Sequence, residues 1–173
     1  MTNVPSAVWI DEAGDVVRST EDCGSSDAWR FTLDRDTHEM PPEAAADAAA
    51  RHAVYFDAVR DWARRGADSR HVRGAADASV EASVADRDEA RAAAFFRLAV
   101  HLRESGDRDG ARSWMHEAAA LSKRSWRIKR ELWTLDDPGN LFAGDFWSEV
   151  DALGDQRYYD PPAIEGMPPQ ATR

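Results

Sequence analysis

Cysteine is almost absent from this chain. Its 173 residues include only Cys23, so no intrachain disulfide can form. No Cys-x-x-Cys motif exists, and this excludes both the redox and the metal-binding version of that motif within these residues.

Long apolar runs are also missing. No stretch approaches the roughly 18–20 apolar residues that a membrane-spanning helix needs. Residues 1–5 carry neither the basic segment nor the apolar run of a secretory signal. We therefore expect a cytoplasmic protein with no membrane partner.

Basic residues are outnumbered, with 22 against 32 acidic residues and a net charge of −10. The electrostatic field of this net negative charge repels polyanions, so we expect no nucleic-acid partner. One local exception interleaves basic residues with tryptophans, a pattern that can stack on bases. We favour a solvated helix face with the tryptophans as core anchors. This basic cluster consists of Arg124, Arg127, Lys129 and Arg130, with Trp126 and Trp133.

Established catalytic motifs are lacking too. Neither Gly-x-Ser-x-Gly nor Gly-x-Gly-x-x-Gly occurs. His101 and Glu104 share a predicted helix whose partner carries His116, and such residues can bind a metal. His101 lies beside the apolar face rather than in it, so we favour surface histidines. We expect no catalytic residue, no metal and no cofactor.

Apolar residues make up 43% of the chain, with seven Trp and six Phe, which is enough for a core. Residues 7–10 and 16–17 are β-formers that flank turn chemistry at 11–14, where Gly14 can take a positive φ. This pattern predicts one β-hairpin. Residues 19–40 are predicted as loop, with a short helix near 26–31.

A helix is predicted to start at Pro41-Pro42-Glu43 and to stop at Arg64-Arg65-Gly66. Its apolar stripe has the spacing i, i+3, i+4, i+7. The stripe consists of Tyr55, Ala58, Val59 and Trp62. A second, short helix is predicted near 76–84.

Two further helices, ending at Gly106 and spanning 111–121, are joined by so short a turn that they must pack antiparallel. Ser125 is predicted to cap another helix, and residues 145–153 form a last one. Pro161-Pro162 and Pro168-Pro169 predict an extended tail whose final residues are disordered.

Together these elements predict a mainly α fold, in which an N-terminal β-hairpin precedes about five helices. We expect three segments. The first, 1–25, holds the hairpin, 26–155 forms a helical domain, and 156–173 is the Pro-rich tail.

The helical pair at 91–121 resembles one tetratricopeptide repeat, in which small residues let two helices approach closely and large residues fill the groove beside them. Here Leu102 replaces the usual aromatic, and no second copy follows at the 34-residue period. The matching residues are Phe95, Leu98, Ala99, Leu102, Ala111, Met115 and Ala118.

A second resemblance covers most of residues 3–161. The hairpin behind Val4-Pro5 looks like the end of a thioredoxin fold, and this resemblance makes Pro5 the cis-proline position. The remainder is similar to the helical extension of actinobacterial redoxin-family proteins, through Trp126-Arg127-Ile128-Lys129-Arg130-Glu131-Leu132-Trp133 and Tyr158-Tyr159-Asp160-Pro161. The preceding βαβ half with the reactive cysteines is not in these residues.

Cys23 follows Glu21 and Asp22, whose carboxylates disfavour a thiolate, so we interpret it as an incidental loop thiol. Three functions stay open. The first is a non-redox, incomplete thioredoxin-like protein whose helices serve packing or protein interaction. The second is the C-terminal portion of a thiol-disulfide oxidoreductase or peroxidase whose Cys-x-x-Cys half is encoded upstream. The third is a stand-alone tetratricopeptide-like adaptor. An open strand edge at 7–10 or 16–17 predicts self-association.

Overall fold

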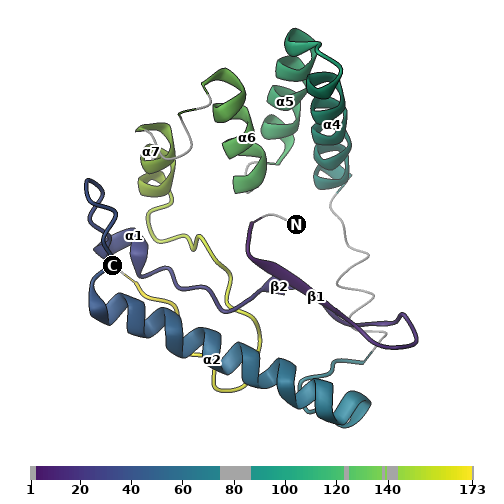
Figure 1. Ribbon diagram of the computed structural model, residues 1–173, viewed down its shortest axis with the longest axis vertical. Coiled ribbons are helices and arrows are strands. Elements are labelled where there is room, and N and C mark those ends of the chain that lie inside the picture. The colour runs from purple at the N-terminus through teal and green to yellow at the C-terminus, as the bar shows by residue number, and fades with distance from the viewer. Residues whose placement is uncertain (1–2, 75–86, 123–124, 138, 140–143, 173) are drawn as a thin grey trace. The chain divides into compact units, whose positions relative to one another are not determined.

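The computed structural model describes residues 3–74, 87–122, 125–137, 139 and 144–172 (Figure 1). The helix expected near 76–84 lies outside them. The elements in chain order are β1 (Ser6–Ile10), β2 (Val16–Asp22), α1 (Trp29–Thr32), α2 (Pro42–Arg65), the 3-10 turn η1 (Gly66–Asp68), α4 (Arg87–Glu104), α5 (Arg108–Leu121), α6 (Trp126–Asp136) and α7 (Gly144–Ala152).

The fold is mainly helical, as the sequence predicts, with an N-terminal antiparallel hairpin and six α-helices in the described residues. Contacts divide the chain into two compact units. The hairpin unit contains Pro5–Ser83 and Leu153–Arg173, and the helical unit contains Met1–Val4 and Val84–Ala152. The hairpin and the tail belong to one of these units, together with α1 and α2.

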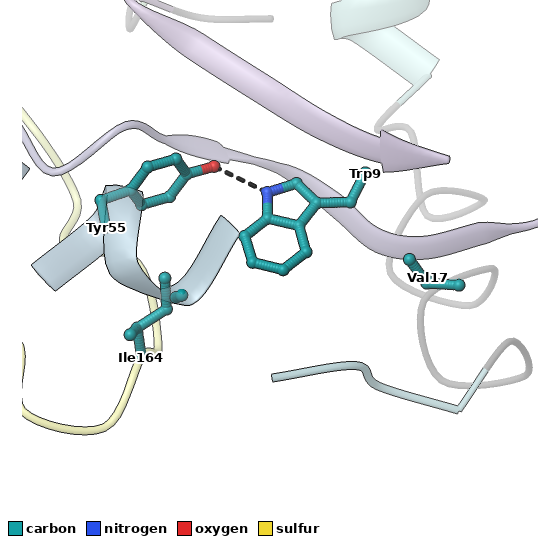
Figure 2. Close-up of a cluster of buried hydrophobic side chains, with 5 residues drawn as sticks. Trp9, Val17, Tyr55 and Ile164 are labelled. Carbon is teal, nitrogen blue, oxygen red and sulfur yellow. Dashed lines mark hydrogen bonds between the residues drawn. The ribbon is translucent and has the colours of Figure 1, made fainter. Parts of the chain in front are cut away.

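The hairpin packs one face against α2. Trp9 and Val17 from the two strands meet Tyr55 and Ala58 of α2 and Ile164 of the tail in one buried cluster. The indole Nε1–H of Trp9 donates a hydrogen bond of 2.8 Å to the hydroxyl of Tyr55 (Figure 2). The predicted stripe of α2 is thus the face that covers the hairpin.

Helix α2 begins and ends where its sequence signals predict. Pro42 occupies the first turn, with Glu43 near the positive end of the helix, and Arg64 and Arg65 lie in the last turn before Gly66. By contrast, β2 extends to Asp22, five residues beyond the predicted 16–17.

Tail residues 153–172 hold buried side chains along most of their length, and the disorder expected of the final residues stays a prediction. They lack helix and strand, as the prolines predict, but Tyr158, Ile164 and Gln170 are buried. Figure 1 shows the tail, in yellow, running back along α2 toward α1. An extended segment can be well ordered when its backbone groups find partners, and the buried side chains of this unit supply them.

Three buried arginines hold the tail by its backbone carbonyls. Arg18, Arg30 and Arg51 are 2%, 8% and 0% exposed. Their guanidinium groups donate to the carbonyl oxygens of Ala163 (from Arg18), Gly154 and Gln156 (from Arg30) and Pro169 (from Arg51). Each arginine thereby satisfies acceptors that proline-rich backbone cannot pair within itself.

In the helical unit, α4 and α5 form the predicted antiparallel pair, and α6 packs on α5. Helix α5 starts at Arg108, three residues earlier than expected, because the carboxylate of Asp107 accepts the backbone N–H of Gly110 and caps it. Ser125 caps α6 as predicted, accepting from the N–H of Ile128.

No described helix is long and apolar enough to cross a membrane.

Candidate functional site

The lone thiol lies directly after β2 and is partly buried. Burial is the largest cause that raises the pKa of Cys23, followed by the charges of Asp22 and Glu21. The sequence predicts the effect of these carboxylates, but not the burial. A raised pKa keeps the sulfur as a thiol at neutral pH, in which form it is a poor nucleophile.

The groups around Cys23 serve the core of the hairpin unit. Arg18 donates two hydrogen bonds to the carboxylate of Glu21, from Nε at 2.8 Å and from Nη2 at 2.6 Å. The hydroxyl of Tyr55 donates to the same carboxylate at 3.3 Å. Burial is the main cause that raises the pKa of this hydroxyl, so Tyr55 stays protonated. This network supports the packing of Trp9 rather than activation of the thiol.

The structure brings together the predicted residues of the helical pair. Ala99, Ala111 and Ala118 have no exposed surface, and Met115 is also buried, so the two helices approach closely there. Phe95 and Leu102 are partly buried beside them, whereas Leu98 is 36% exposed. The pair buries one face of α4 and leaves the Leu98 side open.

The structure also places the residues of two other hypotheses from the sequence, the cis-proline position and the basic cluster. Pro5 is exposed and immediately precedes β1; its assignment as a cis-proline stays a prediction. Trp126 is buried, as expected of a core anchor, whereas Trp133 is only partly buried. Arg127 and Arg130 lie over the rings of Phe96 and Phe146. Arg124 lies outside the described residues.

No group of three or more His, Cys, Asp or Glu able to hold a metal occurs among the residues that the structure describes. His101 and His116 are exposed on α4 and α5. A different feature, which the motifs of the sequence did not indicate, is a groove beside the C-terminal end of α2.

This α2 groove has a volume of about 590 Å³ and lies within the hairpin unit. Residues of α2, of the segment after η1, and of the tail form its walls. They are Val54, Asp57, Ala58, Arg60, Asp61, Arg64, Arg65, Arg70, His71 and Glu165. One signal in the sequence marks it, since residues 60–73 hold five arginines and two aspartates in a chain of net charge −10.

Most charges in the α2 groove are paired with each other. Arg60 binds Asp57 at 2.8 Å and Arg70 binds Glu165 at 3.1 Å, both at exposed positions. Such surface pairs stabilise the fold little. Arg64 differs, because it makes no ion pair or hydrogen bond with any residue that the structure describes.

Comparison with known proteins identifies no relative of this chain. No protein-family model, curated protein or solved structure matches it.

Proposed function

We propose that this protein acts by binding other polypeptide chains, including a second copy of itself, and not by thiol chemistry. The thioredoxin-like and tetratricopeptide-like resemblances belong to this proposal as ancestry. The single observation that carries it is the exposed apolar side of β1.

Strand β1 has one buried and one exposed face. Trp9 is 3% exposed, whereas its neighbours Val8 and Ile10 are 46% and 51% exposed. The sheet has two strands in the described residues, so no strand other than β2 lies beside β1 among them. The free side of β2 is partly occupied, because the N–H of Arg73 donates to the carbonyl of Val17. The open edge that the sequence places at either strand is therefore supported at β1.

A second copy suits this edge because β1, Ser-Ala-Val-Trp-Ile, carries no charged side chain. Two chains of net charge −10 repel each other over most of their surfaces, and the repulsion from side chains is smallest where none is charged. Pairing of β1 with its symmetry mate would add a strand at this edge and place the apolar side chains of the mate beside Val8 and Ile10.

We expect the pure chain to show a dimer mass by light scattering at micromolar concentration. Val8→Lys should give a monomer, because a lysine on an edge strand opposes strand pairing. Phe56→Lys is the matched control, since Phe56 is 50% exposed on α2 of the same unit and should leave the dimer intact. A monomeric wild-type chain, or a Val8→Lys variant that still dimerises, contradicts pairing through β1.

We also expect no turnover in insulin-disulfide reduction or peroxide consumption, for the wild-type chain and for Cys23→Ser alike. The reason is the raised pKa of the thiol and its half-buried position. Turnover by the wild-type chain that Cys23→Ser abolishes would overturn the proposal and favour the oxidoreductase alternative.

The tetratricopeptide-like adaptor remains the second candidate, because α4 leaves one face open. Burial of both faces of the helical pair would exclude a peptide groove there, and the exposure of Leu98 does not meet that condition. This candidate predicts that a bound peptide would protect α4 from hydrogen exchange.

A further inference from the structure

Four arginines and one histidine line the α2 groove, and three of the arginines are paired with carboxylates of the same lining. Arg64 and Arg65 lie in the last turn of α2, where cations compensate the helix dipole, so these two alone do not indicate a ligand. Arg70 and His71 lie beyond the helix, after η1, and the dipole does not explain them.

His71 is the most informative of these residues. It is 7% exposed, yet its side chain lines the groove. The Nε–H of Arg70 donates to its Nε2 at 3.4 Å, and a guanidinium has no acceptor atom. This contact assigns Nε2 as the acceptor and so places the proton of the neutral ring on Nδ1. This Nδ1–H has no acceptor among the described residues.

The free groups of the groove are thus all donors. The planar guanidinium of Arg64 has several N–H donors and no carboxylate partner among the described residues. His71 has one N–H donor on a nearly buried ring. Three carboxylates face four guanidinium groups, so the lining has a formal charge of +1 with His71 neutral. Val54 and Ala58 add a small apolar floor.

We propose that the α2 groove binds a small organic phosphate ester, with Arg64 and Arg70 on the phosphoryl oxygens, His71 Nδ1–H as a further donor, and Val54 and Ala58 against the organic part. A phosphate has three terminal oxygens and a charge near −2, so it can engage several donors at once. Arginine suits it because the fork can bind two oxygens together. A volume of about 590 Å³ exceeds what the phosphoryl group alone fills.

This site is separate from the proposed β1 contact, so either proposal can fail alone. Titration calorimetry with phenyl phosphate, inorganic phosphate and benzoate tests it. Phenyl phosphate should saturate the protein. Inorganic phosphate should bind more weakly because it lacks the apolar contact, and benzoate more weakly still because a carboxylate engages fewer donors.

Arg64→Ala should lower the affinity for phenyl phosphate about tenfold, because it removes a charge-assisted contact without disturbing any internal ion pair. Arg97→Ala is the matched control, an exposed arginine on α4 that also has no partner in the described structure. It should leave the affinity unchanged. Absence of saturable binding, equal losses in the two variants, or benzoate binding as tightly as phenyl phosphate would each overturn the proposal.

His71 supplies a readout independent of affinity. In the free protein, burial lowers the pKa of His71, and the charges of Arg70 and Arg18 lower it further against the opposing effects of Asp61 and Glu165. A bound dianion favours the protonated ring, so the pKa of His71 should rise when phenyl phosphate is added. Nuclear magnetic resonance of the histidine ring measures this, and an unchanged His71 titration in the saturated protein contradicts the proposed contact.

Discussion

Asp27→Ala is expected to lower the free energy of unfolding of the hairpin unit by about 3–5 kcal/mol, because it leaves buried partners without their acceptor. Asp27 is 1% exposed. Its carboxylate accepts the backbone N–H groups of Tyr158 at 2.9 Å and Tyr159 at 3.0 Å, and a guanidinium N–H of Arg30 at 3.3 Å. One side chain thus joins the start of α1 to the tail.

The loss should be specific to the hairpin unit. Hydrogen exchange read by mass spectrometry during urea unfolding separates the two units, and peptides from α4 and α5 should keep their protection. Asp34→Ala is the matched control: its carboxylate also accepts two backbone N–H groups, those of Asp36 and Thr37, but it is exposed. Equal destabilisation by both variants would show that the buried position of Asp27 adds nothing.

Local patterns predicted the elements of this fold well. The stripe from Tyr55 to Trp62 has helical spacing, and the same residues that form the helix form its buried face. The pair α4 and α5 was predictable for the same reason, because a short turn leaves two helices no alternative to antiparallel packing. Turn and cap residues such as Ser125 act over three or four positions, which a sequence displays directly.

The order of the tail was not predictable in this way. Its prolines correctly exclude helix and strand, and their composition is typical of disorder. What orders it is a set of buried arginines in distant segments, and an arginine in a sequence ordinarily indicates surface. Arg51 lies on α2 and contacts Pro169, 118 positions later. No periodicity marks a side chain that binds a carbonyl so far along the chain.

The α2 groove was missed for a related reason. The sequence marks Arg64 and Arg65 as a helix stop, and that interpretation is sufficient for α2 alone. The groove appears only when η1 brings Arg70 and His71 back to α2 and the tail adds Glu165. The sequence predicts that the tail is extended but not where it packs, so a site that includes a tail residue could not be predicted from it.

A chain that ends at Asp160 should therefore lose the hairpin unit altogether. It lacks the tail carbonyls of Ala163 and Pro169, to which Arg18 and Arg51 donate, and it lacks Ile164 from the core. It also lacks Gln170, whose amide accepts from the N–H of Asp27 and donates to the carbonyl of Ser25. The sum of these losses exceeds about 5 kcal/mol, which is comparable to the whole stability of a small domain.

A chain that ends at Ala171 is the matched control, because it removes only the last two residues and keeps every contact of Gln170. It should unfold like the full chain. Amide resonances of β1, β2 and α2 should collapse to unfolded positions in the shorter chain, while those of α4 and α5 remain dispersed. If the hairpin resonances of the chain ending at Asp160 stay dispersed, the hairpin folds without the tail and the prediction is wrong. If they do not, residues 161–170 are part of the core, and the hairpin is stable because the end of the chain returns to cover it.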